Sequence, residues 1–319
     1  MNYRHLVIGG SGFVGSHLVE AILEGDESSS VSVFDNLSMG KIESEAAKNS
    51  SRVELMVGDA TEPLQLLSYI ESYRPNKVWH LAANSDISNS AISSEVDLKS
   101  TFGTTAGVCM AISRMSYRLD SLTFSSTSAI FGSHLTPIDE SSPCRPESSY
   151  GWMKLASEGL LKALHSSGAV AKVLVARFPN VTGLRQTHGV VKDLVYKYFE
   201  TSQDWQILGD GFQEKPYIHA KELVEILIKV EAGLEPESFF QLNVSPDTTS
   251  TVRSIVERIE SCANKNRTPR YGNTPYGWSG DIPKYEFDTS KLRSLGIRVS
   301  SSSDSIAKSV EEEVAAYIG

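Results

Sequence analysis

The sequence of 319 residues has few cysteines, no cluster of basic residues and no long apolar run. Its three cysteines, Cys109, Cys144 and Cys262, are scattered, which excludes a disulfide framework or a zinc site and suits a reducing compartment. The net charge of −9 argues against a nucleic-acid partner. No apolar stretch approaches membrane-spanning length, and the first expected strand leaves no room for a signal peptide. We therefore expect a cytoplasmic protein with no metal, membrane or nucleic-acid partner.

What the sequence does contain is a glycine-rich turn near its start. Residues 6–8 form a short apolar run typical of a buried strand, and residues 13–23 carry apolar side chains at helical spacing. Between them stand three regularly spaced glycines, Gly9, Gly12 and Gly15. Such glycines allow a sharp turn, close approach of the main chain to a pyrophosphate and tight helix–strand packing, while the helix N-terminus attracts the anion. The stretch predicts a dinucleotide-binding site.

An acidic residue, Asp35, ends the second expected strand, about twenty residues beyond the glycine turn. A carboxylate at this place can accept both hydroxyls of an adenosine ribose and would repel a 2′-phosphate. The sequence thus favours NAD over NADP as cofactor. The alternative is that Asp35 only caps its strand.

Strands and helices are expected to alternate along the first half of the chain. We expect strands at 6–8, 31–35, 53–57, 77–83, 119–125 and 171–178, and helices at 13–23, 64–73, 91–115 and 150–165. This order predicts an α/β fold with a doubly wound, Rossmann-like parallel sheet. The rhythm changes after Phe178. We therefore expect an NAD-binding domain at 1–178, with part of 216–245 returning to it, and a smaller, mainly substrate-binding C-terminal lobe at 179–319.

A tyrosine and a lysine lie four residues apart at the start of the helix expected over 150–165. Tyr150 and Lys154 therefore share one helical face, and a neighbouring cation lowers the pKa of a phenol toward that of a usable base. Hydroxyl side chains from Ser125 to Ser128, at the end of the fifth expected strand, would lie beside the nicotinamide. Together these residues predict an acid–base centre; the alternative is an incidental surface pair.

Taken in order, the motifs resemble the extended short-chain dehydrogenase/reductase family, in particular its NAD-dependent sugar-nucleotide epimerase/dehydratase branch. The resemblance covers most of the chain. The shared motifs are Gly-x-x-Gly-x-x-Gly at 9–15, Asp35-Asn36-Leu37-Ser38, Gly58-Asp59, His80-Leu81-Ala82-Ala83, Ser125-Ser126-Thr127, Tyr150 with Lys154, Arg177 to Gly183, Leu208 to Gly211 and Tyr217-Ile218-His219.

The resemblance implies roles for individual residues. Tyr150 would be the acid–base group, Lys154 would bind the nicotinamide ribose, and Thr127 would be the catalytic hydroxyl. The implied cofactor contacts are Gly9, Gly12, Phe13, Val14, Asp35, Asn36, Ser38, Asp59, Ala60, Leu81, Ala82, Ala83, Ser125, Tyr150 and Lys154. The implied substrate contacts are Ser85, Ser126, Thr127, Asn180, His188, Gly189, Val190, Gln206, Leu208, Lys215 and Asp281.

The reaction that the resemblance favours is epimerisation at C4 of a UDP-linked hexose through a transient 4-keto sugar. Every branch begins with Tyr150 removing the proton of the sugar 4-hydroxyl. Dehydratases of the branch carry an Asp-Glu pair directly after the catalytic threonine, whereas Ser128 and Ala129 stand here. The open alternatives are a dehydratase, decarboxylase or net oxidoreductase of the same family and, in another class, a non-catalytic dinucleotide-binding regulator.

Two positions depart from the pattern of the family. Ser100 stands where an asparagine is usual, and Trp278 to Asp281 lack the usual arginine, so a diphosphate would depend on Lys215 or Arg185. The resemblance also implies a homodimer formed through the helices at 91–115 and 150–165. The apolar side chains that either face a partner or pack on the sheet are Leu155, Leu160, Leu161 and Leu164.

Overall fold

The chain divides into two compact units in the computed structural model, which describes residues 3–39, 45–84, 94–134, 137–200, 205–263, 267–277 and 281–318. The first unit comprises Met1–Ile130, Ser148–Arg177 and Val224–Leu242. The second comprises Phe131–Glu147, Phe178–Leu223 and Asn243–Gly319. The expected boundary near 178 therefore misplaces residues 131–147, which fold with the second unit.

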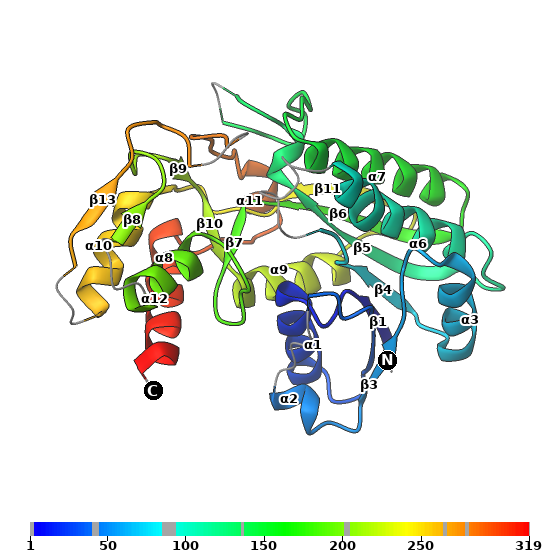
Figure 1. Cartoon of the computed structure of the whole chain (residues 1–319). Coiled ribbons are helices and arrows are strands. Elements are labelled where there is room, and N and C mark those ends of the chain that lie inside the picture. Colours follow the sequence, from blue (N-terminus) through cyan, green and yellow to red (C-terminus); the bar gives the residue numbers. More distant parts are fainter. Residues whose placement is uncertain are drawn as a thin grey trace. The chain divides into compact units, whose positions relative to one another are not determined.

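A seven-stranded sheet lies at the centre of the first unit, in the order β3-β2-β1-β4-β5-β6-β11 (Figure 1). Its strands are β1 (Arg4–Ile8), β2 (Ser30–Asp35), β3 (Val53–Val57), β4 (Lys77–His80), β5 (Leu119–Thr127), β6 (Val170–Phe178) and β11 (Phe239–Asn243). Neighbouring strands from β3 to β5 are parallel, and Ile8 of β1 lies opposite Phe34 on one side and His80 on the other. The strand order reverses between β1 and β4, the point at which such sheets bind ligands. The expected doubly wound, Rossmann-like fold is confirmed.

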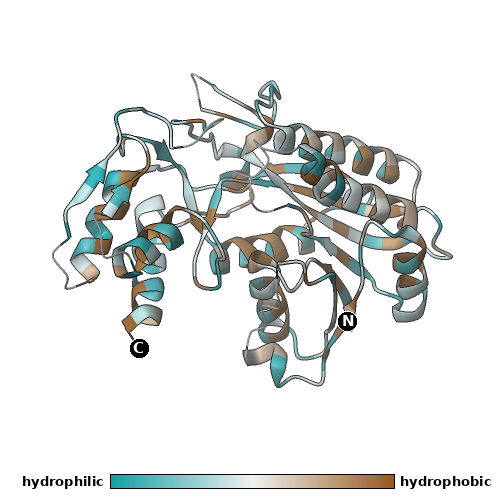
Figure 2. Ribbon diagram, viewed as in Figure 1, coloured by the Kyte–Doolittle hydropathy of each residue, from teal (hydrophilic) through white to brown (hydrophobic). Residues whose placement is uncertain are grey.

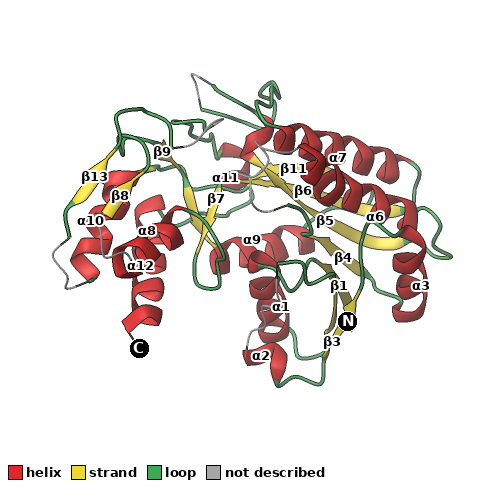
Figure 3. Ribbon diagram, viewed as in Figure 1, coloured by secondary structure: helices red, strands yellow, loops and turns green. Residues whose placement is uncertain are grey.

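Helices cover both faces of this sheet (Figure 3). One face carries α1 (Phe13–Gly25), α2 (Glu45–Lys48) and α9 (Ala220–Ala232), and the other carries α3 (Pro63–Tyr73), α6 (Thr104–Ile112) and α7 (Ser149–Ser166). Strand residues with no exposed surface, such as Leu6, Ile8 and Phe124, form the core together with Leu161 of α7. Because both faces are covered, the central strands β1, β2 and β5 are buried along most of their length.

The single helix expected over 91–115 is wrong in this form. The structure instead has α5 (Ser94–Asp97), a π-helical segment η1 (Leu98–Gly103) and α6. The Thr104 hydroxyl donates to the carbonyl oxygens of Ser100 and Thr101, and Thr105 donates to Thr101. Such back-bonding competes with the regular hydrogen bonds of a helix, which the apolar pattern does not show. The strand expected at 77–83 is also shorter and ends at His80.

Long helices and several short strands build the described part of the second unit. Helices α8 (Val190–Glu200), α10 (Val252–Cys262) and α12 (Ser302–Ile318) enclose an apolar core that includes Tyr198 and Trp205, and hydrophobic residues gather along one side of α10 (Figure 2). The strand pairs are β7 (Asn180–Thr182) with β10 (Tyr217–His219), β8 (Trp205–Ile207) with β13 (Pro269–Tyr271), and β9 (Glu214–Lys215) with β12 (Ser250–Thr251). Among the described residues, no helix is both long enough and apolar enough to cross a bilayer.

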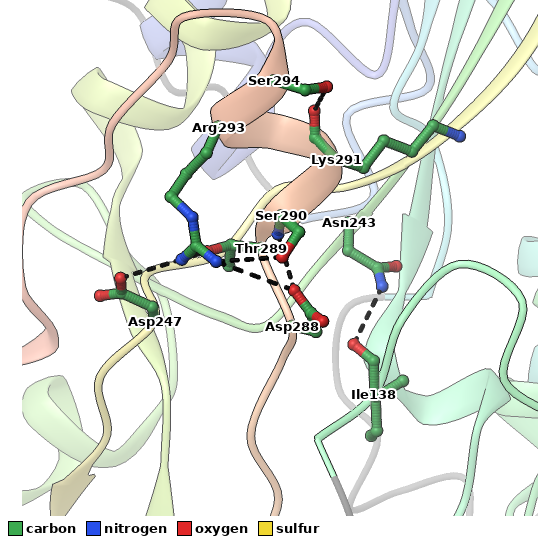
Figure 4. Close-up of polar contacts among 9 residues, drawn as sticks. All are labelled: Ile138, Asn243, Asp247, Asp288, Thr289, Ser290, Lys291, Arg293 and Ser294. Carbon is green, nitrogen blue, oxygen red and sulfur yellow. Dashed lines mark hydrogen bonds and ion pairs between the residues drawn. The ribbon is translucent and has the colours of Figure 1, made fainter.

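Segments far apart in the sequence are tied together in the second unit, which explains why residues 131–147 belong to it (Figure 4). The Asn243 side-chain amide donates to the Ile138 carbonyl oxygen at 3.3 Å, and Ile138 forms a β-bridge with Phe287. In α11 (Ser290–Ser294), Arg293 forms an ion pair with Asp247 at 3.2 Å. These contacts depend on tertiary structure and have no local sequence signal.

Candidate active site

The turn after β1 has room for glycine and little else. Gly9 has a φ of 84°, and a Cβ there would lie 2.6 Å from the Ala82 nitrogen. A Cβ at Gly15 would lie 2.2 Å from the Gly9 carbonyl oxygen. At Gly12, by contrast, a Cβ would meet only that oxygen, at 3.3 Å, and Gly12 precedes α1 without a side-chain hydrogen bond to the helix. An open helix N-terminus fits a dinucleotide pyrophosphate, because its free N–H groups and dipole favour an anion.

The ends of neighbouring strands converge on this turn. The Asp35 carboxylate accepts hydrogen bonds from the amides of Ser11, at 2.9 Å, and Leu37, at 2.8 Å. The amides of Leu81 and Ala82 both donate to the Ile8 carbonyl oxygen. Asp35 and residues 81–83 are therefore placed beside the glycine turn by main-chain hydrogen bonds.

The adenine contacts expected at 59 and 60 lie after β3. Asp59 accepts hydrogen bonds from the main-chain amide and the hydroxyl of Thr61, at 2.9 and 2.8 Å. Ala60 is buried, and a Cβ at Gly107 of α6 would lie only 2.0 Å from its carbonyl oxygen. Glycine at 107 therefore lets α6 pack directly against this loop. Cofactor contacts by Phe13, Val14, Asn36, Ser38, Asp59 and Ala60 stay predictions.

The expected acid–base residues come together where β5 ends and α7 begins. Ser148 caps α7 by accepting a hydrogen bond from the Gly151 amide, which fixes the first turn that carries Tyr150. The Thr127 hydroxyl lies close enough to the Tyr150 phenol to lower the pKa of that phenol. One turn further on, the Lys154 ammonium donates to the Ser125 carbonyl oxygen at 2.7 Å. The tyrosine, lysine and threonine that the sequence singles out thus lie within one cluster.

Burial sets the protonation of both titratable groups. Desolvation lowers the pKa of Lys154 to about 7, against the opposing charge of Glu158. Desolvation also raises the pKa of Tyr150, the charge of Asp97 raises it further, and the Thr127 hydrogen bond opposes both. Without a further cation nearby, Tyr150 is therefore a neutral phenol that can donate a proton. A positively charged cofactor ring beside it would favour the phenolate that accepts one.

A buried network beneath this cluster was missed at the sequence level. Glu158 forms an ion pair with Arg177 of β6 at 2.7 Å, and both side chains are 4% exposed. The same carboxylate accepts hydrogen bonds from the Ser126 hydroxyl, at 2.5 Å, and from the Gln241 amide, at 2.9 Å. Glu158 lies one helical turn beyond Lys154, which is the only local signal for it. Because Ser126 serves this network and is 1% exposed, we exclude it from the proposed substrate contacts.

The second unit holds most of the residues expected to bind substrate. Asn180 of β7 is exposed and lies opposite Tyr217 of β10 in the strand pair. Gln206 and Leu208 are exposed on either side of the buried Ile207.

The loop that leads into α8 carries the other expected contacts of this unit. The His188 ring nitrogen Nδ1 and the Thr187 hydroxyl lie 2.9 Å apart. Gly189 follows with a φ of 121°, and Val190 begins α8. Ser85, like Trp278, falls outside the described residues.

Lys215 and Asp281, both expected at a diphosphate, form an ion pair with each other. The Asp281 carboxylate also accepts a hydrogen bond from the Gly277 amide at 2.9 Å. The two side chains are 15% and 4% exposed, so the ammonium is held by a largely buried carboxylate. An incoming phosphate would have to compete with that carboxylate for Lys215.

The family model for the NAD dependent epimerase/dehydratase family matches residues 5–239. The chain belongs to this family. NAD is the family's cofactor, and the open helix N-terminus after β1 fits it.

Individual relatives of this family differ in the reaction they catalyse. The chain is 26% identical over 284 residues to the putative UDP-arabinose 4-epimerase 4 of Arabidopsis thaliana; the match covers 81% of this chain and 63% of that protein. It is 22% identical to the human dTDP-D-glucose 4,6-dehydratase, over 92% of this chain and 85% of the relative. A crystal structure of a UDP-galactose 4-epimerase superposes with a TM-score of 0.83 at 26% identity, covering 99% of this chain and 100% of the other. The family comprises NAD-dependent enzymes that act on sugar nucleotides, and its members differ in the reaction that they catalyse.

Proposed function

We propose that the protein is a UDP-hexose 4-epimerase that works through a transient 4-keto sugar. The observation that carries the proposal is the pair of residues directly after Thr127. Ser128 and Ala129 open a short 3₁₀ turn there, and neither side chain can serve as an acid or base. Loss of water between C5 and C6 needs such groups beyond the tyrosine, whereas epimerisation needs only Tyr150 and the cofactor.

The chain's own residues would divide the work as follows. Tyr150, with the Thr127 hydroxyl nearby, takes the proton of the 4-hydroxyl and later returns it. Lys154, fixed on the Ser125 carbonyl oxygen, orients the nicotinamide ribose and favours the phenolate. NAD⁺, when bound, supplies the acceptor for the two electrons that leave C4. The proposed substrate contacts are Asn180, His188, Gly189, Val190, Gln206, Leu208 and Lys215, and Asp281 would hold Lys215 until the substrate binds.

The experiment uses purified protein, NAD⁺ and four nucleotide sugars: UDP-glucose, UDP-galactose, UDP-N-acetylglucosamine and UDP-glucuronate. NMR should show interconversion of 4-epimers without net NADH formation. Tyr150→Phe should abolish turnover and still bind UDP. A 4-keto-6-deoxy product would identify a dehydratase, and stoichiometric NADH would identify an oxidoreductase. NAD⁺ binding without turnover of any nucleotide sugar would favour a regulator.

We also propose that the protein is a homodimer. Large apolar side chains on adjoining elements are exposed: Val96 (41%), Leu98 (54%), Met110 (47%) and Trp152 (51%). In contrast, Leu161 and Leu164 pack into the core of the sheet, so they are not partner-facing. Patches of this kind commonly mark protein–protein contacts. Light scattering should give twice the chain mass, and Trp152→Glu should shift it toward the monomer.

A further inference from the structure

A second carboxylate, Asp97, lies beside the candidate acid–base centre and has no role in the chemistry derived above. Asp97 ends α5 and has no exposed surface. One of its oxygens accepts a hydrogen bond from the Asn84 side-chain amide at 2.9 Å, and the other accepts one from the Ser149 hydroxyl. A fully buried carboxylate is costly unless it is hydrogen-bonded in this way, so its place beside a phenol calls for an explanation.

The two partners of Asp97 come from the two segments that matter for the site. Asn84 follows β4, in the same stretch as the residues beside the glycine turn. The main-chain amide of Asn84 donates to the Thr101 hydroxyl of η1 at 3.1 Å. Ser149 is the residue directly before Tyr150. Asp97 therefore connects the end of β4 to the first turn of α7, which carries the phenol.

The charged groups around the Tyr150 phenol come from two different helices. Lys154, on the same face of α7, has its ammonium 5.8 Å from the centre of the Tyr150 ring. Asp97 of α5 accepts a hydrogen bond from Ser149, directly before Tyr150, and its charge raises the pKa of the phenol, whereas Thr127 of β5 contributes only a neutral hydroxyl. Glu158 is further along α7 and is paired with Arg177, and Lys99 of η1 is exposed. Lys154 and Asp97 thus act on the phenol with opposite signs.

We propose that Asp97 is a positioning residue that fixes the first turn of α7 and supplies the negative charge that balances Lys154 and the cofactor at the Tyr150 phenol. The inference rests on the proposed function, since an epimerase must return the proton that it takes. With two cations and no anion nearby, the phenolate would hold a proton too weakly to give it back efficiently, because proton transfer is fastest when the pKa is near the working pH. Asp97 prevents that loss of basicity.

The test is a direct titration of tyrosinate by ultraviolet absorbance in the NAD⁺-supplemented protein, with Tyr150→Phe as the background to subtract. Asp97→Asn should move the titration of Tyr150 to lower pH by on the order of one unit, because a negative charge is removed. The acid limb of the kcat/KM profile should move in the same direction. Glu95→Gln, which removes an exposed charge from the same helix, should move neither.

Ser149→Ala tests whether Asp97 acts through its charge or through its hydrogen bond to α7. This variant loses one hydrogen bond to the carboxylate and keeps the charge, so turnover should fall while the titration stays at or above that of the unmodified protein. An Asp97→Asn titration that does not move, or an equal downward shift in Ser149→Ala, would overturn the inference. Because the titration needs no sugar substrate, it gives its answer even if the epimerase assignment fails.

Discussion

The two lysines expected at the active site are held in opposite ways. In the first unit, Lys154 is buried and donates to a main-chain carbonyl oxygen, while the carboxylate one helical turn away is paired with Arg177. In the second unit, Lys215 is paired directly with Asp281. The first lysine is therefore held by a neutral main-chain oxygen, and burial lowers its pKa to about 7. The second must give up a partner before it can hold an anion.

The different partners of Lys154 and Lys215 match the two roles proposed for them. The role proposed for Lys154, beside the Tyr150 phenol, requires this lysine in every catalytic cycle. A lysine that binds a substrate phosphate is needed only when the substrate is there, and an internal carboxylate satisfies its charge in between. Four predictions examine the comparison.

The largest effect is expected from removing Lys154, the buried lysine of the first unit. Lys154→Met should lower kcat by about a thousandfold, because proton transfer by Tyr150 loses its supporting charge. The free energy of unfolding of the cofactor-free protein should rise in the same variant, since a buried ammonium disappears. That gain should be larger at pH 6 than above pH 9, because the pKa of about 7 leaves the native lysine neutral at high pH.

Activity assays and thermal unfolding at several pH values measure both effects. Lys162→Met, which changes an exposed lysine on the same helix, is the matched control and should alter neither. Retention of most of the activity in Lys154→Met would contradict the assigned role.

The next effect concerns Glu158, the carboxylate that pairs with Arg177 one helical turn beyond Lys154. Glu158→Gln leaves the Arg177 guanidinium buried without its counter-charge, so the free energy of unfolding should fall by about 3 kcal/mol. Urea denaturation measures it. Glu237→Gln, which breaks the exposed ion pair with Arg118, is the control and should have little effect. If both variants lose the same free energy of unfolding, the buried network around Glu158 stabilises the fold no more than an exposed ion pair does.

A smaller effect is expected at the paired lysine of the second unit. Lys215→Ala should weaken UDP binding by about tenfold through loss of a phosphate contact. Asp281→Asn should strengthen UDP binding by roughly threefold, because Lys215 no longer has an internal competitor. Isothermal titration calorimetry with UDP measures both. Weakening in both variants would instead mean that Asp281 itself holds the ligand.

An effect confined to acid pH is expected at an ion pair of the second unit, between Glu312 of α12 and His219 of β10. Burial raises the pKa of Glu312, but the hydrogen bond and charge of His219 outweigh it and lower that pKa to about 2 from an ordinary value of 4.5. The pair therefore stabilises the fold above pH 4.5 and loses this contribution as the pH falls toward 2. Glu312→Gln should flatten the fall in Tm over that range, and an unchanged fall would count against the pair.

The parts of the site that the sequence predicted are those with short-range signals. The glycine turn, Asp35 and the Tyr150/Lys154 pair each depend on a strand or helix that its own residues specify. The sheet order follows from the alternation of those elements. Helix α7 is an example: the observed Ser149–Ser166 lies close to the expected 150–165.

What the sequence did not predict depends on contacts between distant segments. Strand β11 joins the sheet beside β6, although the chain between the two strands belongs largely to the second unit. Glu158 meets Gln241, 83 residues away, and Lys215 meets Asp281, 66 residues away. Asp97 lies in a region expected to be one regular helix, and only the break into α5, η1 and α6 explains its hydrogen bond to Ser149.

The Asp35 carboxylate that receives the Ser11 amide has a consequence for protein engineering. A change of coenzyme preference toward NADP usually begins by replacing the acid at the end of the second strand, to admit a 2′-phosphate. In this chain the same replacement would release the loop on which the pyrophosphate is expected to rest. A successful redesign would therefore have to supply a new acceptor for that amide along with the new phosphate-binding cation.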